Sequence, residues 1–166
     1  MVSPQIIKRY PFFGGISEEH IKDIAMLGDE EVIEAGEVLY ETGEYVDELF
    51  LVENGEFGLY IQVTDHSVDQ SIPDQLLGTV KMENVLVSTV GPGDLVGWSA
   101  LIPPHEATAS VKALVESQVI VLDGEKLRAV FAQDRNFECK MTMKVAQVIR
   151  QRLTARQVES LAFKSA

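Results

Sequence analysis

The stretch from Gly97 to Ala113 (GWSALIPPHEATASVKA) has the composition of a turn that holds a small ligand. A glycine begins it, a short apolar helical turn and two prolines follow, and it ends in a strand of small residues. The indole of Trp98 offers a flat apolar face with one hydrogen-bond donor. If Thr108 and Ser110 alternate to the same side of a strand, both hydroxyls could bond the ligand. We therefore predict a ligand site at Gly97, Trp98, Ser99, Ala100, Ala107, Thr108, Ala109 and Ser110.

No residues are spaced for catalysis or for a metal. The histidines, His20, His66 and His105, are scattered without the spacing of metal ligands. No nucleophile stands beside a base in the sequence, so we predict that the chain is not an enzyme. We also predict no bound metal, and the sequence identifies no cofactor with certainty.

The charge balance argues against nucleic acid as a partner. The chain has 166 residues, with 14 basic against 26 acidic side chains and a net charge of −12, which repels a phosphate backbone.

Cys139 is the single cysteine, so no internal disulfide can form, and we expect a buried thiol. No apolar run is long enough to span a bilayer and no signal peptide is present, so we expect a cytoplasmic protein without membrane contact.

The elements that would position the site are short strands with helices on either side. Ser17 is suited to cap a helix that continues to Leu27, in which His20 should be exposed. Short apolar runs separated by Gly, Pro, Asn and Asp then predict strands, and Asn54-Gly55 is typical of a hairpin. The predicted strands are 31–33, 38–40, 48–52, 56–63, 85–90, 95–96, 110–115 and 118–122. A closed barrel or jelly roll would limit exposed strand edges.

A polar segment interrupts this pattern between residues 64 and 84. We interpret it as a long surface excursion that ends in extra strand near residues 76–81. Its role is left open between a mobile loop and a flap that contacts a partner.

The C-terminal part predicts a long amphipathic helix. Asp123 and Gly124 begin a shorter helix, and from Asn136 the pattern stays helical almost to the end. The apolar stripe on the long helix could pack on its own barrel, but we favour a homodimer interface because a helix of this length would overhang the barrel. The predicted interface residues are Met141, Val145, Val148, Ile149 and Leu153.

Three arginines gather on the same helix. We expect Arg150, Arg152 and Arg156 to lie on its solvated face, although Arg152 and Arg156, at positions i and i+4, could also reach one carboxylate or phosphate.

Several glycine-spaced blocks occur in an order that resembles a known family. GEVLYETGE (residues 36–44), ELFLVENGEFGLY (48–60), GPGDLVG (91–97) and the later ALI and VKA resemble the cyclic-nucleotide-binding domains of the catabolite activator protein and protein kinase A regulatory subunit families. The resemblance covers roughly residues 12–155. It implies a mainly β fold with flanking helices, a jelly-roll-like eight-stranded β-roll or double-stranded β-helix, with a long C-terminal helix at a dimer interface. We accordingly divide the chain into a ligand-binding roll (1–134) and a dimerisation helix (135–166).

The two charged positions of the family's phosphate-binding cassette differ here. The resemblance implies a glutamate that holds the ribose and an arginine that pairs with the cyclic phosphate, and Trp98 and Ala107 stand at these positions. Binding of cyclic AMP or cyclic GMP in the family's usual way is therefore not expected. Either the cassette binds a different small or nucleotide-like molecule, or Trp98 fills the pocket.

These observations predict a stand-alone regulatory domain in signal transduction. It would sense a small molecule and act through an unidentified protein partner. In the transcription-factor branch of the family a winged helix-turn-helix follows the long helix; this chain ends at Ala166, so no DNA-binding domain is expected. The alternative is a ligand-free dimeric interaction scaffold with a pocket filled by Trp98.

Overall fold

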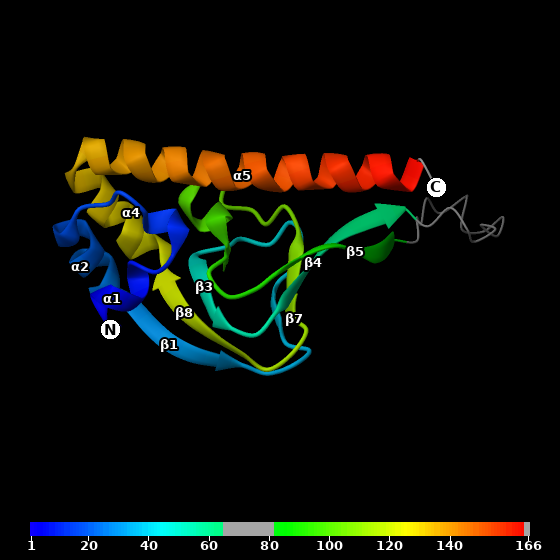
Figure 1. The fold of residues 1–166 in the computed structure, drawn as a ribbon, viewed down its shortest axis with the longest axis horizontal. Coiled ribbons are helices and arrows are strands. Elements are labelled where there is room, and N and C mark those ends of the chain that lie inside the picture. The colour runs from blue at the N-terminus through cyan, green and yellow to red at the C-terminus, as the bar shows by residue number, and fades with distance from the viewer. Residues whose placement is uncertain (65–81, 165–166) are drawn as a thin grey trace.

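A computed structural model describes the backbone of residues 1–64 and 82–164 and the side chains of residues 1–63 and 82–157. Within this part, eight strands form two four-stranded antiparallel sheets, which confirms the predicted β-roll with flanking helices (Figure 1). One sheet has the order β1-β8-β3-β6 and the other the order β2-β7-β4-β5. The strands are β1 (Gly28–Ile33), β2 (Val38–Tyr40), β3 (Glu48–Asn54), β4 (Phe57–Thr64), β5 (Met82–Val90), β6 (Leu95–Val96), β7 (Ser110–Ala113) and β8 (Ser117–Asp123).

The central strand β3 is apolar on both faces because both faces are covered. Phe50 and Val52 belong to the cluster between the two sheets, whereas Leu49 and Leu51 belong to the cluster under the helices. Side chains alternate along a strand, so a continuous apolar run is required wherever a sheet is packed on both sides. The first sheet is thus the middle layer, with the second sheet on one face and the helices on the other.

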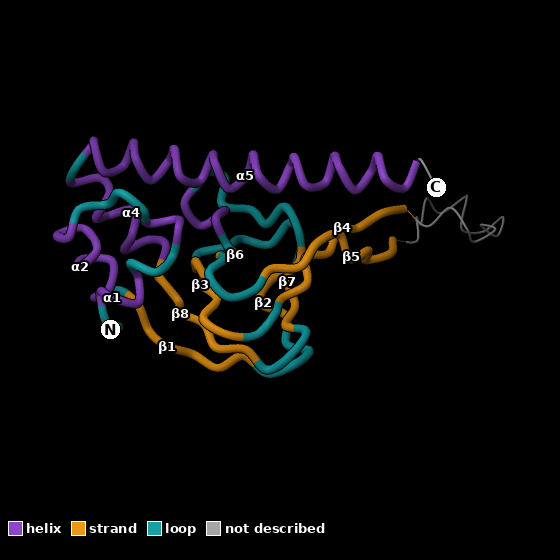
Figure 2. The backbone as a smooth tube through the Cα atoms, viewed as in Figure 1, coloured by secondary structure: helices purple, strands orange, loops and turns teal. Residues whose placement is uncertain are grey.

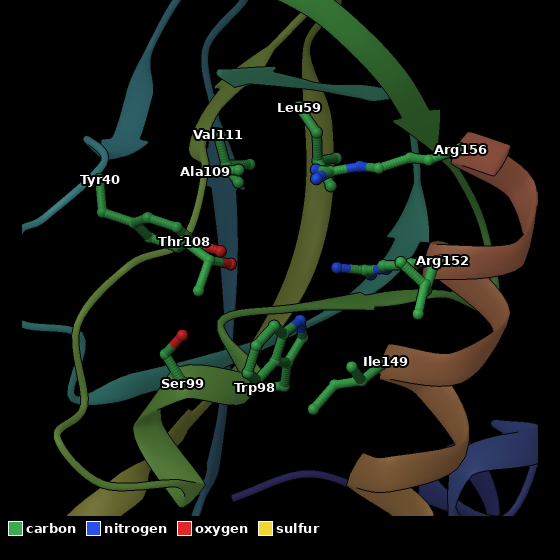
Figure 3. A pocket seen from close by; sticks show the side chains of 11 residues that line it. Tyr40, Leu59, Trp98, Ser99, Thr108, Ala109, Val111, Ile149, Arg152 and Arg156 are labelled. Carbon is green, nitrogen blue, oxygen red and sulfur yellow. The ribbon is translucent and has the colours of Figure 1, made fainter. Parts of the chain in front are cut away.

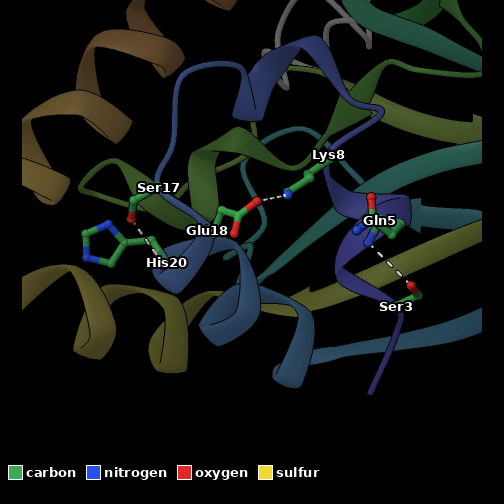
Figure 4. A network of polar contacts seen from close by, with 6 residues as sticks. All are labelled: Ser3, Gln5, Lys8, Ser17, Glu18 and His20. Carbon is green, nitrogen blue, oxygen red and sulfur yellow. Dashed lines mark hydrogen bonds and ion pairs between the residues drawn. The ribbon is translucent and has the colours of Figure 1, made fainter.

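Most of the short helices gather at one end of the roll, and the long C-terminal helix runs from that end along the molecule (Figure 2). The helices are α1 (Pro4–Ile7), the 3-10 turn η1 (Pro11–Phe13), α2 (Glu18–Met26), the 3-10 turn η2 (Trp98–Leu101), α4 (Gly124–Gln133) and α5 (Arg135–Lys164). The predicted capping is present: the Ser17 hydroxyl accepts the His20 backbone N–H (3.3 Å) and Asp123 accepts that of Lys126 (2.9 Å). Lys8 also pairs with Glu18 at 2.7 Å, which joins the segment after α1 to α2 (Figure 4).

Two local expectations are wrong, and a third falls outside the described residues. The turn at Asn54-Gly55 is not a hairpin, because β3 pairs with β6 and β8 while β4 pairs with β5 and β7. The chain passes from one sheet to the other there, and Gly55 (φ 98°) packs directly against Ser117. The thiol of Cys139 is exposed rather than buried. The predicted strand at 76–81 and the whole of residues 65–81, with His66, lie outside the described residues.

His20 is half-buried instead of exposed, and it anchors the start of α5. Its ring stacks on Phe137 with centroids 3.8 Å apart and planes 4° apart. Its Nε2 atom lies 3.4 Å from a carboxylate oxygen of Asp134, between α4 and α5. Phe131 meets Phe137 edge-on from α4, so helices α2, α4 and α5 share one aromatic contact.

The first half of α5 is part of the core. Phe137, Met141 and Val145 are each about 1% exposed and pack with the helices and the first sheet. Further along, α5 passes over the roll and continues beside the end of the β4–β5 pair (Figure 1). Within the described residues no helix, α5 included, combines the length and apolar character needed to cross a membrane.

We predict that Met141→Ala lowers the free energy of unfolding by about 2–5 kcal/mol, because truncation leaves a cavity in the core. Met143→Ala is the matched control: this side chain is 58% exposed on the same helix, so its loss should change stability by less than about 0.5 kcal/mol. Urea unfolding followed by circular dichroism measures both. Equal losses would contradict the packing of α5 described above.

Candidate functional site

A cavity of about 220 Å³ lies between η2, the second sheet and the second half of α5 (Figure 3). Its floor and walls are mostly apolar, and its polar atoms come from a few side chains that converge on it. The described lining residues are Tyr40, Leu59, Trp98, Ser99, Thr108, Ala109, Val111, Ile149, Arg152, Leu153 and Arg156.

Gly97 sets the direction in which η2 begins. Its φ of 83° is left-handed, and a Cβ atom there would lie 2.3 Å from the Glu48 carbonyl oxygen of β3. Only glycine therefore fits without movement. At the other end of η2, the Arg128 guanidinium of α4 donates a hydrogen bond to the Ala100 carbonyl. The turn is held by β3 behind it and α4 beside it.

The segment after the two prolines is fixed by backbone hydrogen bonds to the loop that follows β2. The N–H of Gly43 donates to the Ala107 carbonyl and the N–H of Ala107 to the Glu44 carbonyl, both at 2.8 Å. The N–H of Val46 donates to the His105 carbonyl at 2.7 Å. This pairing leads the chain past the cavity before β7 begins.

The structure brings four of the eight predicted ligand residues to the cavity: Trp98, Ser99, Thr108 and Ala109. The others do not line it. Gly97 makes the turn, and Ala100 and Ala107 are buried in a small cluster with Val46. The expectation that Thr108 and Ser110 share one side of a strand is wrong, because β7 begins only at Ser110, whose hydroxyl lies 3.1 Å from the Thr42 hydroxyl and accepts the Thr42 N–H at 2.9 Å.

Trp98 forms a wall of the cavity and does not fill it. Its side chain is partly buried and packs against the core under the helices, and the cavity remains beside it. Figure 3 shows the indole beside Ile149, below the two arginines. The Trp98-filled pocket of the scaffold alternative is therefore not what the structure contains.

Tyr40 adds a hydroxyl from the strand opposite α5. Burial raises the pKa of Tyr40 to about 12, against smaller opposite effects from the charge of Arg152 and a backbone hydrogen bond with Gly97. The phenol is consequently neutral near pH 7 and can donate a hydrogen bond. The sequence offered no sign of this role, because Tyr40 and Leu59 come from strands distant in the chain.

Arg152 and Arg156 both line the cavity from α5. The expectation that they lie on the solvated face is wrong for Arg152, which is partly buried and donates to the Leu95 carbonyl. Arg150 is exposed as expected. The i, i+4 spacing was the one sequence feature that pointed to both arginines.

The predicted dimer stripe divides into two parts. Met141 and Val145 are core residues of their own chain, with Val148 packed partly against them, so the first two are not accessible to a second chain. Ile149 and Leu153 are 37% and 57% exposed and also line the cavity.

A model of the cyclic nucleotide-binding domain matches residues 30–134, which is more than half of the chain. The chain belongs to the cyclic nucleotide-binding domain family. A candidate cyclic nucleotide-binding protein from Geobacter metallireducens has a similar structure, with a TM-score of 0.73, 25% identity and coverage of 92% of this chain and 99% of that one. The catabolite activator protein of Thermus thermophilus matches with a TM-score of 0.62 at 19% identity, over 93% of this chain and 63% of that one, which shows the fold.

A candidate potassium channel protein of Rhodopseudomonas palustris is 25% identical over 141 residues. The match covers 85% of this chain and 30% of the channel protein, so this chain spans less than a third of that relative's length.

The cavity of this cyclic nucleotide-binding domain lacks the two charges that the resemblance implies for the cassette. Trp98 stands in place of the glutamate, and Ala107, in place of the arginine, is packed into an apolar cluster. Among the described residues, no three His, Cys, Asp or Glu side chains come together as they would to hold a metal. The charged groups at the cavity come instead from α5.

We predict that Gly97→Ala destabilises the protein by more than the roughly 1–2 kcal/mol of a left-handed alanine, because the new Cβ also meets backbone. Gly15→Ala is the matched control: φ is 79° there and nothing lies within 4 Å of an added Cβ, so only the conformational cost applies. Trp98 is the single tryptophan, and its fluorescence in a urea titration follows both variants. If the two variants lose the same stability, the close approach of Gly97 to Glu48 is wrong.

Proposed function

We propose that this domain is a regulatory sensor, which binds a small molecule in the cavity between Trp98 and α5 and acts through a protein partner. The observation that carries the proposal is that the cavity beside Trp98 stays open although the family's two charged cassette positions are replaced. A pocket that no longer binds a ligand could be filled by one large side chain. Trp98 is large enough to do so, but it lies in the wall of the cavity and leaves the cavity open.

The lining favours a small ligand with a planar or apolar body. The volume of about 220 Å³ is below the roughly 300–1,000 Å³ typical of pockets for drug-sized molecules. Trp98, Leu59 and Val111 offer apolar contact, while Ser99 and Thr108 offer hydroxyl groups. Cyclic AMP and cyclic GMP would lack their usual partners here, so we propose a different ligand.

Helix α5 is the element through which binding would be transmitted. The cavity has one wall on the roll and the other on the second half of α5, so a ligand contacts both. A ligand can shift a conformational equilibrium only through contacts that differ between the two states. A ligand that contacts both α5 and the roll meets this condition, because it would lose one set of contacts if the helix moved away from the roll. In the potassium channel relative, a domain like this one occupies under a third of the chain, which is consistent with a module that controls another.

A ligand at about 100 times its Kd should stabilise the fold by about 2.7 kcal/mol and raise Tm by on the order of 5–10 °C. We predict such a shift, with a change in Trp98 fluorescence, for at least one compound in a set of nucleotides, nucleosides and central metabolites.

Thr108→Phe, which places a ring in the cavity from an exposed position, should abolish the response, whereas Thr142→Phe, exposed on α5 and outside the lining, should keep it. The sensor proposal fails if no compound in the set shifts Tm or fluorescence.

We also propose a homodimer through the exposed part of the α5 stripe. Ile149 and Leu153 stand open to solvent on a helix that extends past the roll, and a second chain would cover them.

Leu153→Glu should then shift the sedimentation equilibrium toward monomer, whereas Met143→Glu, an equally exposed site on the core half of the helix, should not. A monomeric wild-type protein at micromolar concentration would refute the homodimer and leave the sensor intact.

A further inference from the structure

The cavity is cationic in a strongly acidic protein. The chain carries a net charge of −12, yet the charged side chains among the described lining residues are two arginines, and no carboxylate is among them. No carboxylate of residues 1–63 and 82–157 lies within ion-pair distance of either guanidinium group. The local charge is therefore opposite in sign to that of the molecule as a whole.

The two arginines approach the cavity side by side from successive turns of α5. Figure 3 shows the side chain of Arg156 extending from the helix toward Leu59 and that of Arg152 extending in the same direction next to it. Arg152 uses one Nη atom to donate to the Leu95 carbonyl, which fixes its position and leaves its other N–H groups for another acceptor. Guanidinium groups are planar and always charged, and they match the oxygens of a carboxylate or phosphate in pairs.

Holding Arg152 in this place costs free energy unless an anion is near. Burial lowers the pKa of Arg152 below its usual value, and the neighbouring charge of Arg156 acts in the same direction, while Tyr40 and Asp94 oppose them. Two like charges beside an apolar cavity repel each other, and both would be stabilised by one anion between them. The neutral hydroxyl groups of Tyr40 and Thr108 lie across the cavity and can donate to the same anion.

We propose that the ligand of this domain is a small anion-bearing molecule, and that Arg152 and Arg156 of α5 bind its phosphate or carboxylate group. This inference rests on the proposed sensor function and names its ligand class. The positive charge that the resemblance places in the cassette is supplied here by the C-terminal helix. The anion then bonds directly to α5, while the body of the ligand lies against Trp98 on the roll.

The test uses the indole N–H resonance of Trp98, which is unique in a ¹⁵N-labelled sample because the chain has one tryptophan. At constant ionic strength, inorganic phosphate, acetate and acetamide are titrated separately. We expect phosphate or acetate to shift the resonance saturably and acetamide, the neutral counterpart of acetate, to leave it in place. The response to phosphate against acetate tells which anion the site prefers.

Arg152→Gln and Arg156→Gln should each weaken the anion response by at least about tenfold, the loss expected for one charge-assisted hydrogen bond. Arg150→Gln, exposed on the same helix and outside the lining, should retain wild-type affinity. Should Arg152→Gln fail to fold, Arg156→Gln decides, because Arg156 is exposed.

The anion site is overturned if the variant that combines Arg152→Gln and Arg156→Gln responds as the wild type does, or if the wild type responds to neither anion. In that event a neutral compound found by the thermal-shift screen would leave the sensor function standing. Absence of any hit in both experiments would overturn both proposals.

Discussion

The burial of the first half of helix α5 is the constraint on which the rest of the site depends. Phe137, Met141 and Val145 fix the rotation of the helix, since each must face the core. A helix repeats its face at intervals of three or four residues, so Arg152 and Arg156 continue the face of Met141 and Val145. At 1.5 Å per residue, Arg152 lies roughly 16 Å beyond Met141 along the axis. The same face is apolar over the core and cationic over the cavity.

This arrangement explains how the domain can keep a family pocket without the family's charged residues. An arginine in the cassette belongs to the roll, so the anionic group of a ligand bound to it is held by the roll. Here the cassette position is an alanine packed in an apolar cluster, and both guanidinium groups belong to the helix. The cost of desolvating Arg152 lowers the stability of the arrangement in which α5 lies over the cavity. An anion would restore that stability, and it would do so only while α5 lies over the cavity.

The strands and the helix caps were predictable from the sequence because they depend on local patterns. Ser17 and Asp123 cap helices wherever the chain continues as a helix, and the apolar runs lie within a few residues of the observed strands. Pairing is not local. Asn54-Gly55 indicates where the chain turns, but not that β3 and β4 join different sheets. Cys139 and His20 were misjudged because burial on a helix depends on what covers each face.

The site was predictable only in the part that one continuous segment supplies. Trp98, Ser99, Thr108 and Ala109 come from the cassette stretch, and the family's blocks locate it. Tyr40 and Arg152 arrive from elements far apart in the sequence, and their meeting depends on the rotation of α5. That rotation could have been inferred by following Met141 and Val145 to Arg152 instead of to Leu153. The predicted apolar stripe continued to Leu153 because that residue is apolar. The helical spacing leads instead to Arg152.

The turn at Gly97 is also held by hydrogen bonds from two helices, one on each side of the glycine. Arg152 of α5 bonds the Leu95 carbonyl just before Gly97, and Arg128 of α4 bonds the Ala100 carbonyl just after it. Gly97 packs so closely against the Glu48 carbonyl that no side chain fits there. Because Ala100 belongs to η2, a displacement of η2 relative to α4 would change the hydrogen bond from Arg128. One of these hydrogen bonds is made by α4 and the other by α5, so the segment around Gly97 is bonded to both of the helices that meet at Asp134.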